Sequence, residues 1–419
     1  MSTNQGLQPL VRSLLRTRAY GNLSRDTRKL HIMRILFDAR EETRNVTGIG
    51  TYVRSLAREL RALPCPEPAC RCIPDGPPRR PPAEGKRPFA AQLLNFGRNV
   101  FWKQVYLPGR ALLESADLLV CMDPITPLRS PVPVALILYD LIFLTGRAQT
   151  DAWTRYWRLL VPRCARRAER VFTLSQATRV RIVEELGLDP EKVIVFRTGV
   201  ADHFRPLGLD GPRRAQLRRE LSLPDAFVLT VGAHDPRRNV KTLLAAHRML
   251  TARRGLVQKL VVIGPKTPHF SEIWKETVAL GMERDVLYLD YVPNEELPLY
   301  YNLADLYVYP SSEEGFGLTP LEAMACGCPV VTSRASSLPE VVGDAALTVD
   351  PASAREISEA MARILWDREL RARLVTAGLE RAAGRSWRKG AEDIVNACVE
   401  WFERKKRAAA PASSTVDSR

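Results

Sequence analysis

Short apolar runs of strand length alternate with helix-like segments along most of this 419-residue chain. Because strands that alternate with helices form βαβ units, the pattern predicts an α/β fold built on parallel sheets. The alternation is interrupted once, where residues 205–224 become polar and are marked by prolines. The sequence therefore predicts two Rossmann-like domains, at residues 32–204 and 225–385, joined by a linker at 205–224.

The apolar runs give the expected strands of each domain. In the first domain they lie at residues 33–39, 117–121, 132–139, 171–174 and 193–196. In the second they lie at residues 226–232, 259–264, 285–289, 306–309 and 329–332. A Pro-rich insertion from Pro64 to Pro88 predicts an irregular surface loop. The tail at 406–419, rich in Ala, Ser and Pro, is expected to be disordered.

Charge and cysteine content limit the classes of partner and cofactor. The formal net charge of +15 favours anionic partners such as nucleic acid, anionic lipid or phosphorylated substrates, with a solvated basic surface as the alternative. No recognisable nucleic-acid module accompanies the charge, so we expect no nucleic-acid partner. The eight cysteines form no Cys-x-x-Cys pair, which predicts reduced thiols and no zinc site.

Targeting features are weak. The longest apolar run, Pro131 to Leu144, is broken by Asp140 and is shorter than the about 20 residues that span a bilayer. No apolar core precedes a cleavage site near the N-terminus, which predicts a cytoplasmic protein. The basic arm at 1–31 is expected to be a flexible tail or to rest on an anionic membrane surface. Its basic residues are Arg12, Arg16, Arg18, Arg25, Arg28 and Lys29.

The loop after the strand at 306–309 is the strongest candidate for a ligand site. Ligands of open α/β sheets bind outside the carboxyl ends of the strands, where this loop lies. Gly315 and Gly317 allow the backbone to approach a ligand closely. The Thr-Pro-Leu-Glu sequence at 319–322 predicts a capping box with its proline at the first helical position. Free amides at such a helix start favour a phosphate.

Two acids bracket this loop. The carboxylates of Glu314 and Glu322 can accept hydrogen bonds from pairs of sugar or ribose hydroxyls. The alternative is that Glu322 is only a helix cap and Glu314 only a surface charge. Further upstream, Arg237 and Arg238 follow a strand that ends at Gly232, and guanidinium groups there suit a diphosphate. Two ordinary surface arginines are the alternative.

The first domain offers two weaker candidates. Gly48 and Gly50 lie at an expected helix start and permit close approach to a phosphate or sugar, although a tight turn would explain them equally. Asp140 follows a strand and is a candidate contact for an acceptor. The neighbouring Tyr139 is either part of that site or a core residue at the strand end.

The segment from Glu314 to Val331 resembles the Glu-x7-Glu signature of retaining GT-B glycosyltransferases of family four, also called group 1. Residues 309–311, 336–341 and 343–346 also resemble that family, and the resemblance covers nearly all of residues 33–400. It implies two facing Rossmann-like domains with a central cleft. The C-terminal domain would hold the donor and the N-terminal domain the acceptor. It also implies that a helix at 386–405 crosses back to the first domain.

The resemblance assigns roles to residues of this sequence. It places Glu314 near the transferred sugar, Glu322 at the ribose hydroxyls and Arg238 at the phosphate. The implied catalytic residues are Glu314, Arg238 and Asp140. The implied donor-binding residues are Gly232, Arg237, Gly315, Phe316, Gly317, Leu318, Thr319 and Glu322. The implied acceptor or cleft residues are Gly48, Gly50, Tyr139 and Ser175.

Four positions depart from the family pattern. Thr51 and Ala233 stand where arginines are usual, Tyr139 where a histidine is usual, and Thr198 where an asparagine is usual. These departures allow a degenerate member of the family that binds ligand without catalysis.

The resemblance implies a hexosyltransferase that moves a sugar from a nucleotide diphosphate sugar with retention of configuration. The implied acceptor is a glycan or a lipid-linked molecule, as in polysaccharide or glycolipid synthesis. The loop at Gly48 and Gly50 is similar to that of bacterial mannosyltransferases, which favours GDP-mannose; UDP-glucose and UDP-N-acetylglucosamine remain alternatives. No Asp-x-Asp metal handle is present, so we expect neither a metal nor a cofactor.

Overall fold

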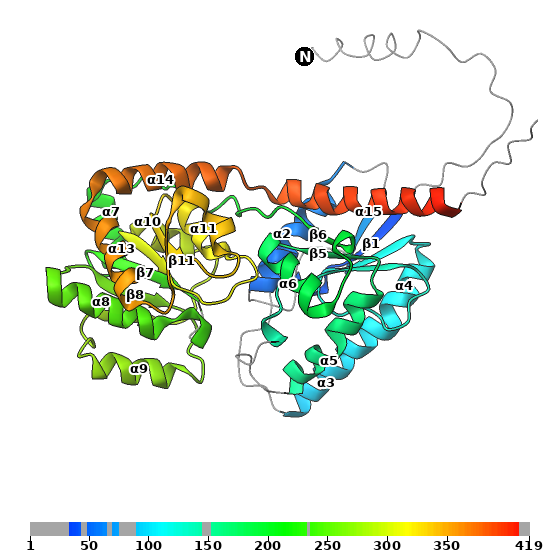
Figure 1. The fold of residues 1–419 in the computed structure, drawn as a ribbon, viewed down its shortest axis with the longest axis horizontal. Coiled ribbons are helices and arrows are strands. Elements are labelled where there is room, and N and C mark those ends of the chain that lie inside the picture. The colour runs from blue at the N-terminus through cyan, green and yellow to red at the C-terminus, as the bar shows by residue number, and fades with distance from the viewer. Residues whose placement is uncertain are drawn as a thin grey trace, which may run out of the picture. The chain divides into compact units, whose positions relative to one another are not determined.

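The computed structural model describes residues 33–42, 48–64, 69–74, 89–144, 152–232 and 235–409. All of them belong to one compact unit. They form two six-stranded parallel sheets with helices packed around them (Figure 1). This confirms the predicted α/β class with two Rossmann-like halves. The basic arm at 1–31, Ala233 and the chain beyond Ala409 lie outside the described residues.

The first sheet has the strand order β2-β1-β3-β4-β5-β6. Successive residues of its strands pack into different cores: Ile35 and Phe37 belong to one, and Leu36 to another. Both faces of the sheet are therefore covered, as in parallel sheets generally. The strands are β1 (Arg34–Asp38), β2 (Ala69–Ile73), β3 (Leu118–Cys121), β4 (Val134–Ile137), β5 (Arg170–Thr173) and β6 (Val193–Val195).

Helices of the N-terminal domain connect these strands. They are η1 (Arg40–Glu42), α2 (Gly48–Ala62), α3 (Phe89–Phe101), η2 (Trp102–Tyr106), α4 (Leu107–Leu113), η3 (Ile142–Leu144), α5 (Ala152–Arg167), α6 (Gln176–Leu186) and η4 (Pro190–Lys192). A π-helical turn, η2, joins α3 to α4 without a break, so the three form one continuous rod. Ser175 caps α6 by accepting a hydrogen bond from the Thr178 amide.

The second sheet has the order β12-β11-β10-β7-β8-β9. Its strands are β7 (Phe227–Val231), β8 (Lys259–Ile263), β9 (Val286–Leu289), β10 (Leu306–Tyr309), β11 (Val330–Ser333) and β12 (Leu347–Val349). The helices of this C-terminal domain are α7 (Gly211–Glu220), η5 (Pro236–Arg238), α8 (Val240–Arg254), α9 (Phe270–Ala279), α10 (Leu297–Leu303), α11 (Leu318–Ala325), α12 (Leu338–Val342), η6 (Gly343–Ala345), α13 (Ala354–Trp366) and α14 (Arg368–Ala383).

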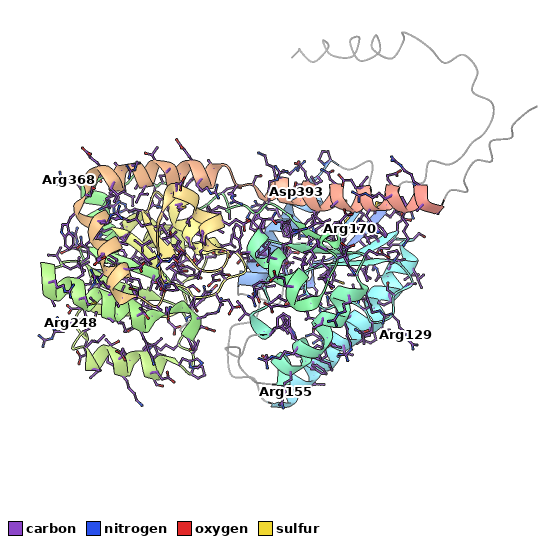
Figure 2. The ribbon with its side chains drawn as sticks, viewed as in Figure 1. Arg129, Arg155, Arg170, Arg248, Arg368 and Asp393 are labelled. Carbon is purple, nitrogen blue, oxygen red and sulfur yellow. The ribbon has the colours of Figure 1, made fainter. Side chains whose placement is uncertain are left out.

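The last helix, α15 (Trp387–Ala409), lies against the N-terminal domain. The ring of Trp387 meets that of Tyr52 edge-on, with 5.7 Å between centroids. A Cβ on Gly390 would lie 2.0 Å from the carbonyl oxygen of Arg197, so the close approach requires glycine. Asp393, labelled in Figure 2, accepts two hydrogen bonds from the Arg197 guanidinium, at 2.8 and 2.6 Å.

Two sequence expectations need correction or detail. The Pro-rich insertion is not wholly irregular, because its Ala69–Ile73 run forms β2 and pairs in parallel with β1. The flanking prolines conceal this short apolar run. The predicted linker at 205–224 contains the helix α7, which Asp210 caps by accepting a hydrogen bond from the Arg213 amide.

A buried ion cluster lies at the carboxyl end of the first sheet. The ammonium group of Lys103, on η2, contacts the carboxylates of Asp38 and Asp123. The indole of Trp102 donates a second hydrogen bond to Asp38, at 3.0 Å. Burial lowers the pKa of Lys103, but the two carboxylates outweigh it and raise that pKa well above its usual value. Lys103 therefore stays charged and is the cation that these acids need.

Replacing Lys103 with Met should destabilise the protein by about 3–5 kcal/mol, because it leaves two buried carboxylates without the cation that pairs with them. Urea unfolding monitored by circular dichroism measures the change. The matched control is Lys241→Met, which removes a lysine from an ion pair whose two side chains are about half exposed; it should cost less than about 1 kcal/mol. Equal stability of the two variants would contradict the proposed role of Lys103.

Candidate active site

The loop between β10 and α11 carries the first signature acid, Glu314, and the second, Glu322, lies on α11 itself. The loop enters α11 at Gly317, whose φ of +106° is in the left-handed region that favours glycine. No side chain caps this helix, which begins at Leu318, and the Glu322 side chain bonds to Tyr301 instead. The predicted capping box is therefore wrong. The glycine at the helix start, rather than Thr319, sets where α11 begins.

Glu314 is the centre of a dense hydrogen-bond network. Its Oε1 accepts hydrogen bonds from Ser311 Oγ at 2.6 Å and from Tyr309 Oη at 3.0 Å. The same oxygen contacts Arg237 Nη1 at 3.2 Å and Arg238 Nη1. Burial raises the pKa of Glu314, but the two guanidinium charges outweigh it and lower that pKa below its usual value. The acid is therefore ionised and is not a surface charge.

The two arginines lie where the sequence predicts them, after β7 and within η5. Arg238 stacks over the Tyr309 ring at 4.9 Å, and a Cβ on Gly232 would lie 3.3 Å from its Nε. That Nε is buried and has no hydrogen-bond acceptor among the described residues. Glu314 contacts both guanidinium groups, and Asp235 forms a further ion pair with Arg237, at 3.6 Å. The buried Nε of Arg238 is therefore the donor that this cluster has to offer an anion.

Three serines that the sequence analysis did not select hold the loop in place. Ser336 and Ser337 donate hydrogen bonds to the Glu314 carbonyl, at 2.6 and 3.0 Å. Ser337 also donates to the Phe316 carbonyl at 2.7 Å, and Ser311 reaches Glu314 as described above. Family-like residues at 336–341 were the available signal for the first two. The family-like residues at 309–311 were the available signal for Ser311.

Glu322 occupies a different environment from Glu314. It is 5% exposed on α11 and accepts one hydrogen bond, from Tyr301 Oη at 3.3 Å. Burial raises its pKa from 4.5 to about 7, and the bond from Tyr301 opposes this only partly. Near neutral pH, Glu322 can therefore exchange a proton or accept hydroxyl hydrogen bonds as a carboxylate.

The raised pKa of Glu322 predicts a pH-dependent stability. Because the folded-state pKa of about 7 exceeds the ordinary 4.5, the folded protein holds the proton more tightly. This stabilisation is complete below the ordinary pKa and is lost as the pH rises through 7, by about 3 kcal/mol in total. Gln does not titrate, so the unfolding free energy of Glu322→Gln minus that of the parent should increase by about 3 kcal/mol from roughly pH 5 to pH 8. Parallel curves of unfolding free energy against pH would contradict the assignment.

The signature loop is also bonded to the N-terminal domain. The Gly315 carbonyl accepts hydrogen bonds from Ser175 Oγ at 2.8 Å and Thr178 Oγ1 at 2.9 Å. A Cβ on Gly315 would lie 2.1 Å from the Tyr139 carbonyl oxygen, so only glycine fits this approach. Ser175 is fully buried and holds the loop.

Two acids of the C-terminal domain add to these bonds with α6. The Glu340 carboxylate accepts hydrogen bonds from the Gln176 amide at 2.8 Å and the Ala177 amide at 3.3 Å. Glu313 forms an ion pair with Arg181 at 2.6 Å. A negative group at a helix N-terminus is favourable, so Glu340 stabilises the contact between the two domains.

The remaining site candidates of the N-terminal domain, Tyr139, Asp140 and Gly48, have different surroundings. The Tyr139 ring is buried, packs 5.3 Å from the Tyr52 ring, and its hydroxyl donates to the Met122 carbonyl at 2.9 Å. This supports its interpretation as a core residue. Burial raises the pKa of Asp140, while a hydrogen bond from the Ile142 amide and the charge of Arg237 oppose this. The acid lies beside the signature loop, since a Cβ on Gly315 would be 3.0 Å from the Asp140 Cβ. Gly48 opens α2, and a Cβ there would meet nothing within 4 Å.

Across the described ranges, no group of three or more His, Cys, Asp or Glu side chains is arranged to hold a metal ion. None of the helices described is both long and apolar enough to cross a bilayer.

Comparison with solved structures defines the class. The fold matches that of Anabaena HepE in complex with UDP and glucose, with a TM-score of 0.65 and 18% identity over 89% of this chain and all of that one. The chain therefore has the GT-B fold. One family described as "Glycosyl transferases group 1" matches residues 213–381, and one described as "Glycosyltransferase Family 4" matches residues 46–204. Together they span most of the chain, which belongs to the group 1, family-four glycosyltransferases.

Mannosyltransferases are among its relatives. The chain is 32% identical to O-antigen chain mannosyltransferase B of Escherichia coli over 230 residues, 55% of this chain and 60% of that protein. It is 28% identical to the serotype-specific mannosyltransferase WbdA of Escherichia coli over 278 residues, 65% of this chain and 34% of that protein. The matched parts thus cover less than two thirds of either relative.

Proposed function

We propose that this protein transfers a hexose from a nucleotide diphosphate sugar to a glycan or lipid-linked acceptor, with retention of configuration. The observation that carries the proposal is the cluster of Arg237, Arg238 and Glu314 beside the start of α11. Two guanidinium groups suit the two phosphates of a donor, and one has a buried Nε with no acceptor among the residues that the structure describes. The free amides at Leu318 and Thr319 add to the positive potential.

The chemistry follows from where charge develops. Breaking the bond between the sugar and the diphosphate leaves negative charge on the diphosphate. Arg238 and the amides at the start of α11 stabilise this charge without having to move. The departing phosphate oxygen then takes the proton of the acceptor hydroxyl on the same face of the sugar, which preserves the configuration. Glu314 accepts hydrogen bonds from the sugar hydroxyls, and Glu322 from the ribose. No step of this route needs a metal.

GDP-mannose is the donor we propose. The Gly48–Gly50 loop and the mannosyltransferase relatives favour it, while the match to a protein bound to UDP and glucose keeps UDP-glucose and UDP-N-acetylglucosamine as alternatives. A thermal-shift screen of these three sugars tests the choice. A ligand at 100 times its Kd should stabilise the fold by about 2.7 kcal/mol. No shift with any of them would contradict donor binding.

A second candidate is a binding subunit without catalysis. Tyr139 occupies the position where the family has a histidine, and its side chain is buried in the N-terminal core. It offers no imidazole to the reacting sugar. Such a protein would bind the donor in the thermal-shift screen but release no nucleotide with any acceptor. A released-nucleotide assay therefore separates the two candidates.

The proposed acceptor bears on location. A lipid-linked acceptor would bring a cytoplasmic enzyme to the inner face of a membrane as a peripheral protein. The positive net charge of the chain is consistent with such a surface.

A further inference from the structure

One side of the N-terminal domain exposes apolar side chains along the rod made by α3, η2 and α4. The most exposed are Leu94 (70%), Phe101 (59%), Val105 (56%), Leu112 (61%) and Leu113 (82%). Leu94, Phe101, Val105 and Leu112 recur at spacings of seven, four and seven, which keep side chains near one side of a helix. The other side faces the core through Lys103, Leu107 and Ala111. The rod thus carries apolar side chains on its exposed side as well as on the side that packs into the core.

The helix α5 lies beside this rod (Figure 1), and the rings of Phe96 and Tyr156 join the two at 5.3 Å. It adds Leu159, which is 56% exposed. Arg129 and Arg155, labelled in Figure 2, lie on the same part of the domain. The surface therefore extends over two neighbouring helical segments. We refer to the exposed side of α3, α4 and α5 as the helical face.

The charge of the helical face has one sign. Residues 89–113 and 152–167 contain no Asp or Glu. Their basic residues are Arg98, Lys103, Arg110, Arg155, Arg158, Arg163, Arg166 and Arg167. Lys103 is buried and Arg110 is paired with Glu114 at the end of α4, but Arg98, Arg155, Arg163, Arg166 and Arg167 are exposed. The C-terminal domain has fewer exposed large apolar residues on any one element: Trp274 and Val278 share α9, while Val257 and Trp366 lie elsewhere.

We propose that the helical face docks on an anionic lipid bilayer. Leu and Phe side chains can enter the boundary between headgroups and acyl chains, while arginines around them meet lipid phosphates. Each basic residue near an anionic leaflet adds to the attraction, and no carboxylate of these helices opposes it. The inference deepens the proposed lipid-linked acceptor, but it rests on surface chemistry and not on the transfer reaction.

Sedimentation with vesicles tests the proposal on the full-length chain. The parent should pellet with vesicles of phosphatidylglycerol and phosphatidylcholine at low salt, and much less with phosphatidylcholine alone. The variant Leu94→Ser, Phe101→Ser, Leu113→Ser should lower its partition coefficient at least about tenfold, because it removes three exposed apolar groups. A second variant, Arg155→Gln, Arg163→Gln, Arg167→Gln, should lower binding to anionic vesicles by a similar factor or more.

The matched control is Val257→Ser, Trp274→Ser, Val278→Ser, which removes three exposed apolar residues from the C-terminal domain and should pellet like the parent. A chain that begins at Ile32 lacks the N-terminal arm, and it should keep most of the binding to anionic vesicles. The proposal would be overturned if the parent failed to pellet, or if both helical-face variants pelleted like the parent. It would also be overturned if removal of the arm abolished all vesicle binding. Donor-induced thermal shifts of the same variants should match the parent, so failure here is distinct from failure of the proposed function.

Discussion

Replacing Arg238 with Ala should lower kcat by about 100- to 1,000-fold, the range found when one donor to a developing negative charge is removed from an active site. Its guanidinium contacts Glu314, stacks over Tyr309 and keeps one buried Nε without an acceptor among the described residues. The proposed leaving diphosphate would take that free donor. Steady-state rates of nucleotide release at saturating donor measure the loss.

Two further variants show whether the loss belongs to Arg238 itself. Arg219→Ala removes an exposed arginine from α7 and should leave kcat at the parent value. Arg238→Lys keeps the charge but not the fork of donors, so it should recover only part of the rate. A parent-like kcat for Arg238→Ala would contradict its proposed role at the diphosphate.

The two signature acids should separate binding from turnover. Glu322→Gln should raise the donor Kd by about 10- to 100-fold, because a buried charged acceptor is lost from the ribose site. Glu314→Gln should lower kcat by a similar factor without weakening donor binding. Its carboxylate neutralises Arg237 and Arg238, so its removal increases the positive charge that meets the diphosphate.

The measurements are donor titrations for Kd and single-turnover rates for the chemical step. Glu220→Gln, which changes an exposed acid on α7, is the control and should alter neither quantity. The raised pKa of Glu322 should make the donor affinity of the parent rise with pH near 7, as Glu322 loses its proton. The Glu322→Gln variant should show no such rise. If both acid variants bind and turn over donor like the parent, the assignment of the signature acids is wrong.

Local pattern predicted the fold and part of the candidate site. The alternation of apolar runs indicated the strands that became β7 and β10, and their carboxyl ends carry Arg237, Arg238 and Glu314 as expected. Two strands were missed. Prolines flank β2, although its pairing with β1 is regular, and β12 has only three residues, too few for a distinct apolar run. The start of α11 was misplaced by two residues, because Thr319 resembles a cap and the glycine before Leu318 acts as one.

Contacts between distant parts of the chain could not be predicted in this way. Ser175 and Gly315 are 140 positions apart, and Gln176 and Glu340 are 164 apart. Nothing in either local sequence specifies these pairs. The pKa of Glu322 likewise depends on burial and on Tyr301, which lies on another helix. The sequence also left open whether Tyr139 is a core residue or a site residue. Only the packing of its ring against Tyr52 in the structure distinguishes the two.

Calorimetric titration of GDP-mannose, UDP-glucose and UDP-N-acetylglucosamine into the parent and into Arg237→Ala, Arg238→Ala tests whether the two arginines hold a sugar nucleotide. We expect one of these sugars, GDP-mannose by our proposal, to bind the parent at a single site. The double variant should weaken that binding by at least about 30-fold, since two charge-assisted contacts to the diphosphate are lost. Binding of none of the three sugars, or equal affinity of parent and double variant, would contradict the proposed donor site.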